Sequence, residues 1–362
     1  MADVAAAAGV SVSTVSRALR GLPGVGEEQR RRIEGIAAQL SYVVSPDASR
    51  LARGGTGRIA VVLDNVDRWF FGTVLAGIER VLRAADFDVL VYHVDGEEER
   101  QRFFADLPAR RKVDGVIVVA LPAPAHEFAR LSLMGVHVVV AGGRMGEFEC
   151  VRIDDVAAAR TAVSHLTGLG HRHVAMLRTR DSGGAVWPTD QARTEGYLEA
   201  MAQVGVRPED PDALLGDQDT PLGGTHPVLT IPFGADHGWA ATERLISGPH
   251  PPTAIFAHSD EIAFGCLQAL RHHGWSVPQD MSVVAIDDHP LSGVMGLTTV
   301  AQPVRTQGEL AAMAMLGSLG GTPVAGAGGA GGAADHVVAT TLVVRGSTGR
   351  PREAGAPLGS DG

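Results

Sequence analysis

The chain has 362 residues, and 31 Lys and Arg against 41 Asp and Glu side chains give it a formal net charge of −10. That balance argues against a protein that coats nucleic acid with bulk positive charge. Two cysteines, Cys150 and Cys266, cannot form a disulfide framework or a four-thiolate metal site. The sequence contains no 18-residue apolar run and no signal-peptide pattern, so we expect a cytoplasmic protein without a transmembrane helix.

The charge is unevenly distributed along the chain. Residues 1–58 carry eight Arg and five acidic residues, a surplus of +3, whereas residues 59–362 carry 23 basic and 36 acidic residues, a balance of −13. Such asymmetry is typical of a nucleic-acid-binding end attached to an acidic body. A solvated basic helix face is the alternative interpretation.

The N-terminal 40 residues are predicted to form three short helices, at 3–8, about 13–19 and about 27–40. Ser11 is a candidate N-cap for the second helix because its hydroxyl can accept a bond from a free backbone N–H group. The predicted core face of the third helix consists of Ile33, Ile36, Ala37 and Leu40.

Four residues have the spacing of a helix-turn-helix. Ala5 allows the two helices to approach, Gly9 makes the turn, and Val10 and Val15 fix the second helix. An ordinary three-helix bundle is the alternative that spacing leaves open. The side chains expected on the exposed face, or at the start, of the second helix are Ser11, Val12, Ser13, Ser16 and Arg17.

That face suits the major groove of DNA. Arg17 is the usual type of guanine reader, and Val12 is able to contact a thymine methyl group. Ser11 and Ser16 are suited to bind phosphates, which would set the position of the helix without reading sequence.

Beyond residue 58 the pattern changes to apolar runs that alternate with helical stretches. Near-continuous apolar runs are typical of parallel strands that are buried on both faces. Their arrangement in two blocks predicts two doubly wound α/β domains, with a ligand site in the cleft at the carboxyl ends of the strands. The predicted strands are 59–63, 87–94, 113–120, 136–141, 174–177, 254–257 and 283–286. The Gly-rich stretch Gly321–Ala334 is predicted to be a loop.

The sequence does not favour an enzyme. The pairs His171/His173 and His272/His273 lack a third convergent metal ligand, so we expect no metal and no cofactor. The single lysine, Lys112, follows no glycine, which excludes a Gly-Lys phosphate loop. No Gly-x-Ser-x-Gly nucleophile elbow occurs either.

The stretch DVAAAAGVSVSTVSRALRG at the N-terminus resembles the lac repressor and galactose repressor family of bacterial transcription regulators. Further blocks resemble family segments in the family's order, among them GRIAVVL, VRIDD, HLTGLGHRHVAML, PPTAIFAHSDEIAF and LTTVAQPV. The resemblance implies an N-terminal all-α helix-turn-helix head and an α/β core. That core would consist of two doubly wound parallel-sheet subdomains of the periplasmic-binding-protein type.

The resemblance also implies the domain boundaries. A DNA-binding domain at 1–45 and a hinge at 46–58 would precede an effector-binding and dimerisation core at 59–346. The N-terminal subdomain would comprise about 59–152 and 302–333, and the C-terminal subdomain about 153–301 and 334–346. Residues 347–362 are expected to form a disordered tail, because they are rich in Gly, Pro and Ser.

In the family the second helix enters the major groove, which implies base-reading roles for Val12, Ser13 and Arg17. Tyr42 falls where a family tyrosine approaches the DNA backbone. Leu51 falls where a leucine is wedged into the central minor groove, with Ala48 beside it, and such a wedge kinks the duplex. A simple core leucine is the alternative for Leu51.

The resemblance places the effector in the cleft. Arg193 matches an arginine that clamps ligand hydroxyls or a carboxylate, and Asp287 matches an aspartate that binds sugar or ribose hydroxyls. Phe233 matches a stacking aromatic residue, and Trp69 and Phe70 match apolar residues of the cleft; core packing is the alternative for all three. The other matched positions are Ser259 and Asp260, and for Asp260 the alternative is a charge partner for the N-terminus of its helix. Gly142-Gly143 stands where some sugar-binding members have an aspartate, which leaves the effector's identity open.

We therefore predict a homodimeric repressor that binds a pseudo-palindromic double-stranded operator and responds to a small polar effector, such as a sugar. Two alternatives remain open. One is a periplasmic-type sugar-binding protein without a DNA function, and the other is a regulator that is controlled by a protein partner.

Overall fold

The computed structural model describes residues 1–19, 21–42, 55–122, 124–180, 187–206, 227–320 and 334–352. The chain divides into two compact units, Met1–Gly57 and Arg58–Gly362. The predicted hinge residues Ala48 and Leu51 lie outside the described residues.

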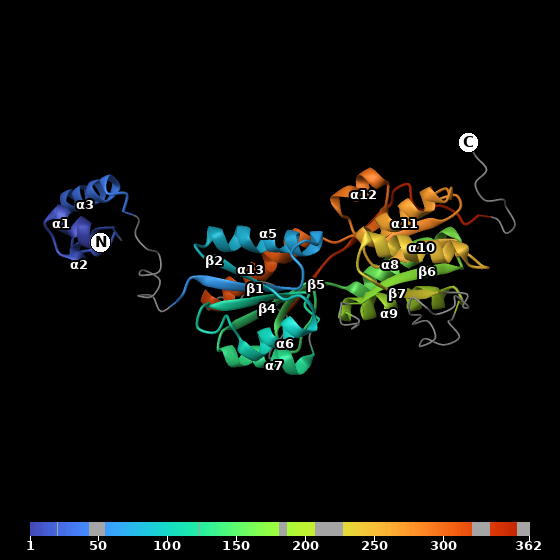
Figure 1. The fold of residues 1–362 in the computed structure, drawn as a ribbon, viewed down its shortest axis with the longest axis horizontal. Helices are drawn as coiled ribbons and strands as arrows, with labels where there is room; N and C mark the ends of the chain where they lie inside the picture. The colour runs from blue at the N-terminus through green and yellow to red at the C-terminus, as the bar shows by residue number, and fades with distance from the viewer. Residues whose placement is uncertain are drawn as a thin grey trace. The chain divides into compact units, whose positions relative to one another are not determined.

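The first unit is a three-helix head made of α1 (Ala2–Ala8), α2 (Val12–Leu19) and α3 (Glu27–Gln39) (Figure 1). Gly9 ends α1 with a φ of 64°, in the left-handed region that glycine adopts without strain. Ser11 Oγ accepts a hydrogen bond from the Thr14 N–H at 3.1 Å, so the predicted cap of α2 is confirmed. The buried core of the head consists of Val4, Ala5, Ala8, Val15, Ala18, Ile33 and Ala37.

One prediction for the third helix is wrong. Ile33 and Ala37 are buried as expected, but Leu40 is 49% exposed. The helix ends at Gln39, so Leu40 is its C-cap and no longer continues the buried face.

The second unit contains two six-stranded sheets. The first sheet has the order β11-β5-β4-β3-β1-β2, and all its pairings are parallel. Its strands are β1 (Arg58–Leu63), β2 (Asp88–His93), β3 (Gly115–Val119), β4 (His137–Ala141), β5 (Glu149–Ile153) and β11 (Asp335–Val338). Its helices are α5 (Trp69–Ala84), α6 (Gly96–Asp106), α7 (Ala125–Leu131), the 3₁₀ turn η1 (Ser132–Met134) and α13 (Val304–Gly320).

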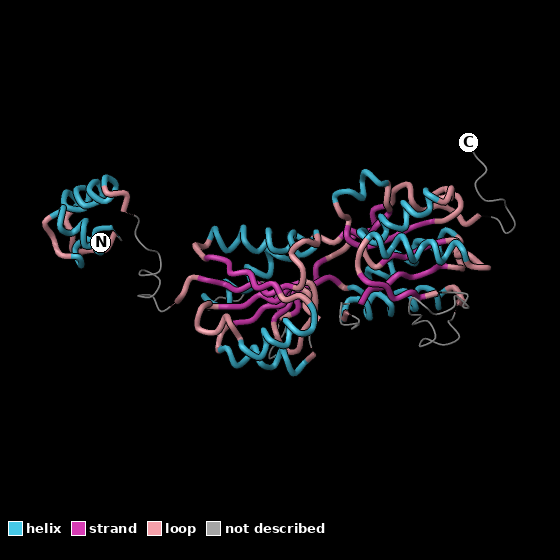
Figure 2. The backbone as a smooth tube through the Cα atoms, viewed as in Figure 1, coloured by secondary structure: helices cyan, strands magenta, loops and turns pink. Residues whose placement is uncertain are grey.

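Helices cover both faces of this sheet (Figure 2). Strand β1 shows why the apolar run is continuous: Ile59, Val61 and Leu63 pack with α5 and α13, whereas Ala60 and Val62 pack with α6 and α7. Side chains alternate between the two faces of a strand, so a strand covered on both sides must be apolar at every position.

The second sheet repeats this architecture in the order β12-β10-β9-β8-β6-β7. Its strands are β6 (Val174–Arg180), β7 (Val228–Pro232), β8 (Ala254–Ala257), β9 (Ser282–Asp287), β10 (Thr298–Ala301) and the antiparallel edge strand β12 (Thr341–Val343). Its helices are α8 (Asp155–Leu169), α9 (Pro188–Gln203), α10 (Ala235–Ser247), α11 (Asp260–His272) and α12 (Pro290–Met295). The predicted fold class, a helical head followed by two doubly wound subdomains, is confirmed.

The chain passes between the two sheets three times, from β5 to α8, from β10 to α13, and from β11 to β12. The third crossing corrects one predicted boundary. Residues 334–346 were expected to belong wholly to the second subdomain, but β11 pairs with β5 of the first sheet, from Asp335↔Cys150 to Val338↔Ile153. Only β12 joins the second sheet.

The C-terminal tail is also ordered further than its composition predicts. Ser347 is buried, and its hydroxyl donates to the Val283 carbonyl at 2.6 Å and accepts from the Thr298 N–H at 2.8 Å. The Gly349 N–H donates to Ser282 Oγ at 3.0 Å. The prediction of disorder from residue 347 onward is therefore wrong for residues 347–349, because these bonds hold them against the amino-terminal ends of β9 and β10.

Candidate ligand cleft and DNA-reading helix

A cavity of about 680 Å³, a volume that includes space open to solvent, lies between the two subdomains of the second unit. Its walls come from the carboxyl ends of the strands and from the helices that follow them, as the topology requires. The first subdomain contributes Arg68, Phe70, Phe71, Ala120, Gly142, Ile153, Gln302 and Gln307, and the second contributes Asp155, Thr179, Trp187, Thr189, Arg193, Phe233, His258, Ser259, Glu261 and Asp287.

Arg193 of α9 is held at the floor of this cleft. Its Nε donates to Asp155 Oδ1 at 2.8 Å, and a terminal nitrogen donates to the His258 carbonyl at 2.5 Å. Burial by itself lowers the pKa of Arg193, but the neighbouring carboxylates of Asp155 and Asp287 outweigh it and raise that pKa. The guanidinium is therefore a fixed positive charge that cannot be lost.

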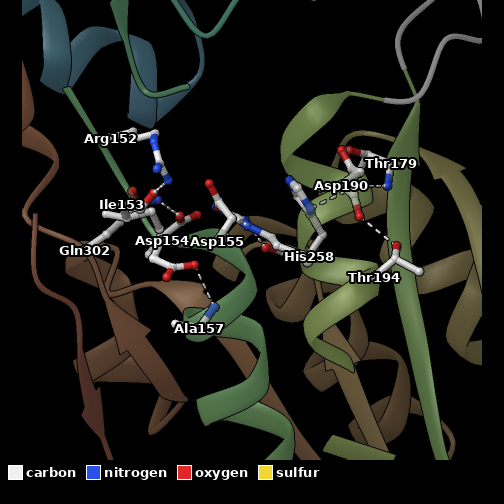
Figure 3. A network of polar contacts seen from close by, with 12 residues as sticks. Arg152, Ile153, Asp154, Asp155, Ala157, Thr179, Asp190, Thr194, His258 and Gln302 are labelled. Carbon is white, nitrogen blue, oxygen red and sulfur yellow. Dashed lines mark hydrogen bonds and ion pairs between the residues drawn. The ribbon is translucent and has the colours of Figure 1, made fainter. Parts of the chain in front are cut away.

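Asp155 is positioned by the crossing from β5 to α8, where Asp154 Oδ1 accepts the Ala157 N–H at 2.9 Å and caps the helix (Figure 3). On the other side of the same view, Asp190 accepts both the backbone N–H and the hydroxyl of Thr179, at 2.6 and 2.9 Å. His258 Nδ1 lies 2.9 Å from Asp190 Oδ1, in a geometry that does not form a hydrogen bond. This cluster fixes the ends of β6 and β8 at the cleft.

Asp287 ends β9 and belongs to a chain of side-chain bonds. Gln307 Nε2 donates to Gln302 Oε1 at 2.9 Å, and Gln302 Nε2 donates to Asp287 Oδ1 at 2.5 Å. Burial raises the pKa of Asp287 above the ordinary carboxyl range, and the charge of Asp260 raises it further. The backbone of Asp287 has a φ of 142°, a conformation that residues other than glycine rarely adopt and that is often found at binding sites.

Three buried polar atoms of the lining form no hydrogen bond in the part of the chain that the structure describes, and one of them, His258 Nδ1, still faces the Asp190 carboxylate at 2.9 Å. Ser259 Oγ and Gln307 Oε1 are both buried and accept or donate no hydrogen bond. Leaving a buried polar group unpaired costs about 1–3 kcal/mol. A bound molecule with hydroxyl groups would remove that cost.

Two contacts connect the subdomains beside the cleft, and aromatic rings line it. The Arg68 guanidinium carbon lies 4.2 Å from the centroid of the Phe233 ring, a cation–π contact. The Trp69 N–H donates to Glu261 Oε1 at 3.2 Å. Phe70, Phe233 and Trp187 supply the apolar surface of the lining.

The structure brings together five of the seven predicted effector residues: Phe70, Arg193, Phe233, Ser259 and Asp287 line the cavity. The other two do not line it. Trp69 packs against the His289 ring at a centroid distance of 4.9 Å. Asp260 is buried and accepts bonds from Ser292 Oγ at 2.5 Å, Thr299 Oγ1 at 2.6 Å and the His289 N–H at 2.8 Å. These three hydrogen bonds occupy its carboxylate and connect the start of α11 to α12 and β10.

Several lining residues were not predicted. His258 and Gln302 each follow directly after a strand, Asp155 lies two residues after β5, and Thr179 lies near the end of β6. The rule that polar residues at the carboxyl ends of parallel strands meet at one edge would have selected Thr179 and His258, because their strands were predicted. Asp155 and Gln302 follow β5 and β10, which were not predicted. Gln307 lies one turn into α13 and carries no such signal.

In the head, the predicted DNA-reading face of α2 is open. Val12 is 47% exposed, Ser13 and Arg17 are exposed, and Ser16 is half-buried. Ser11 is exposed, but its hydroxyl already caps α2. Tyr42 is half-buried against the core of the head.

Two findings concern what the described residues lack. No group of three or more His, Cys, Asp and Glu side chains among them is placed to hold a metal ion. No helix in the described ranges combines the length and the apolarity needed to cross a bilayer.

Two family matches cover the two units. The family described as "Bacterial regulatory proteins, lacI family" matches residues 1–45, and the "Periplasmic binding protein-like domain" matches residues 163–348. The HTH-type transcriptional regulator MalR of Streptomyces coelicolor is 31% identical over 99% of this chain and 99% of its own length.

Two solved structures share the fold. The complex of the transcriptional regulator CelR with cellobiose has a TM-score of 0.65 at 26% identity and covers 95% of this chain and 98% of its own. The lac repressor dimer bound to operator and an anti-inducer has a TM-score of 0.80 at 23% identity, with 96% and 98% covered.

A helix-turn-helix head joined to a two-subdomain binding core defines a ligand-modulated DNA-binding transcriptional regulator, and not an enzyme. The chain belongs to the lacI family of bacterial regulatory proteins.

Proposed function

We propose that the chain is a transcriptional repressor whose affinity for its operator is changed by a small polyhydroxylated ligand, such as a sugar, in the cleft. The observation that carries this proposal is the pair of buried, unpartnered atoms, Ser259 Oγ and Gln307 Oε1, beside the fixed groups of Arg193 and Asp287. The cellobiose complex of CelR supports the choice of a sugar.

A polyol suits these groups because each hydroxyl both donates and accepts. Vicinal hydroxyls would donate to Asp287 and Gln307 Oε1 and accept from Arg193, while Ser259 Oγ can serve in either role. Phe70 and Phe233 offer faces on which the C–H surface of a ring would pack.

On the DNA side, the proposed reader is α2. Val12, Ser13 and Arg17 would contact base edges in the major groove, whereas Ser16 and Ser11 would contact phosphates, as would Tyr42. The hinge residues Ala48 and Leu51 would approach the minor groove, with Leu51 as the wedge.

The proposed assembly is a homodimer that places two heads on the half-sites of a pseudo-palindromic operator, because dimer symmetry imposes symmetry on the site. Support comes from the lac repressor dimer bound to operator, which has the same fold. The proposed location is the cytoplasm, where a bacterial regulator meets the chromosome.

The test is a thermal-shift screen of sugars, nucleosides and amino acids, followed by operator binding with and without each ligand that raises the melting temperature. We expect a sugar-like ligand to bind and to change operator affinity. Asp287→Ala should abolish that change while operator binding without ligand stays normal. Asp236→Ala, at a mainly exposed carboxylate of α10, is the matched control and should respond normally.

Two results would point to the alternatives. Normal operator binding with no ligand found would favour control by a protein partner. Tight ligand binding by a protein that fails to bind any operator would favour a periplasmic-type binding protein without a DNA function.

A further inference from the structure

The acidic core carries a run of three consecutive basic residues on its surface. Residues 59–362 have a balance of −13, yet Arg110, Arg111 and Lys112 are consecutive, and Lys112 is the only lysine of the chain. All three side chains are exposed. These three residues are named here the basic turn.

The backbone of the basic turn is held in place by the residues on either side of it. Leu107 and Ala109 before it and Val113 after it are buried in the core of the first subdomain. The Arg110 N–H donates to the Leu107 carbonyl at 2.9 Å, and the Lys112 N–H donates to the Ala109 carbonyl at 3.0 Å. Apolar anchors on both sides therefore hold the three cations at the surface.

Arg111 has a φ of 61°, in the left-handed region that costs a non-glycine residue free energy. That conformation keeps the turn tight and its side chains directed into solvent. The three cations also form no ion pair or side-chain hydrogen bond with any residue that the structure describes. By contrast, other arginines of this subdomain are paired, such as Arg80 with Glu309 at 2.7 Å.

The turn lies at the edge of the sheet where the chain arrives from the head. The Asp114 N–H, next after Val113, donates to the carbonyl of Arg58 at 2.8 Å, and Arg58 is the first residue of β1. Strands β1 and β3 are parallel, so this is their amino-terminal edge, and the ligand cleft lies at the opposite edge. Asp88 and Asp114 share the edge, and each has an interaction of its own.

We propose that the basic turn binds backbone phosphates of the operator while the head reads its bases, so that the core adds a sequence-independent contact to DNA. The inference rests on operator binding by the head. Thirteen peptide steps separate Tyr42 from Gly55, and a chain of that length spans at most about 45 Å. DNA held by the head is therefore tethered to this edge of the core.

Duplex DNA carries one negative charge for about every 1.7 Å of its axis, which makes it a natural partner for three clustered, exposed cations that have no ion pair among the described residues. Phosphate contacts fix position and carry no sequence information. A homodimer would present the turn twice. The basic turn would then supply part of the electrostatic affinity that the modest surplus of +3 in residues 1–58 leaves small.

The experiment measures how operator affinity of the full-length protein depends on salt for the parent and for R110Q/R111Q/K112Q. Each phosphate contact contributes about 0.9 to the slope of log affinity against log salt concentration. Raising the salt concentration from roughly 50 to 200 mM lowers operator affinity by some factor. If the triple variant loses two contacts, that factor should be about ten times smaller for the variant than for the parent. Its preference for operator over mutated operators should not change.

Three further variants make the result specific. R110K/R111K keeps the charges and should keep the parent's slope. R160Q/R172Q/R271Q removes three exposed charges from the second subdomain and should also keep it. Arg17→Ala should instead lower the preference at one base position, because a base contact and not a phosphate contact is lost.

An unchanged slope in R110Q/R111Q/K112Q overturns the proposal. An equally reduced slope in R160Q/R172Q/R271Q also overturns it, because net charge alone would then explain the effect. An equally reduced slope in R110K/R111K overturns it as well, because it would indicate a structural role for these residues. A parent that binds no operator contradicts the proposed function instead. Thermal melting and the ligand-induced shift of each variant verify that the fold and the cleft are intact.

Discussion

The carboxyl of Asp287 is buried and also lines the ligand cavity. It is held by Gln302, and burial raises its pKa. The resemblance to the family was enough to select Asp287 and Arg193 from the sequence. It did not select Gln302 and Gln307, because the bonds that join them to Asp287 form only where the chain crosses between subdomains.

Asp287→Asn should make stability less sensitive to rising pH. A carboxyl with a raised pKa holds its proton in the folded state at a pH where the unfolded chain, with an ordinary pKa of about 3.9, has lost it. The free energy of unfolding therefore falls as pH rises from that ordinary value through the raised one. The amide cannot titrate but keeps an oxygen for Gln302, so the variant should gain stability relative to the parent at alkaline pH, as urea unfolding at acidic, neutral and alkaline pH will measure.

Asp335→Asn is a control for which the effect of pH on stability should have the opposite sign. The hydrogen bond from Arg152 lowers the pKa of Asp335, so its stabilising contribution is present above the ordinary pKa and lost as pH falls through the lowered one. That variant should lose stability at neutral pH and approach the parent in acid. Parallel pH profiles for the parent and Asp287→Asn would contradict the assignment.

At the scale of elements, the subdomains depend on helices that pack backbone against backbone. A Cβ atom on Gly265 of α11 would collide with the Ala235 carbonyl at the start of α10, and one on Gly77 of α5 would collide with the Arg305 carbonyl of α13. Apolar runs predicted the central strands, because burial on both faces leaves no freedom of composition. Strands β5 and β11, of sequence ECVRI and DHVV, mix polar and apolar residues and escaped that prediction.

Gly265→Ala should destabilise the core by about 1–3 kcal/mol, the usual cost of forcing extra volume into a packed contact. Gly168→Ala is the matched control, because Gly168 is a helical and exposed residue of α8 with no atom within 4 Å of an added Cβ. Alanine there should stabilise by about 0.5–1 kcal/mol. Urea unfolding midpoints will measure both, and equal effects would show that helix propensity outweighs the close contact.

At the scale of the whole molecule, one chain connects a DNA-reading head to a ligand cleft. The two-subdomain architecture was predictable from repeated strand–helix patterns. The position of β11 was not, because its pairing with β5 joins segments 185 positions apart, as in Asp335↔Cys150, and no local pattern records it.

Coupling between the two functions must be reciprocal. If the ligand changes operator affinity by some factor, saturating operator must change ligand affinity by the same factor, since both report one coupling free energy. Titration calorimetry of the ligand, with operator and with an unrelated duplex of equal length, will measure this. Equal ligand affinity in both samples would exclude the ligand as the effector.

The three crossings between the sheets have a consequence for synthesis on the ribosome. Among the described residues, the buried core of the head is formed within residues 1–42, so that core is complete once this short segment has emerged. Neither half of the core can finish early, because the first sheet waits for β11 and the second for β12. At about 5–20 residues per second, that interval lasts on the order of tens of seconds. Every nascent chain therefore carries a folded helix-turn-helix head before its ligand cleft is complete.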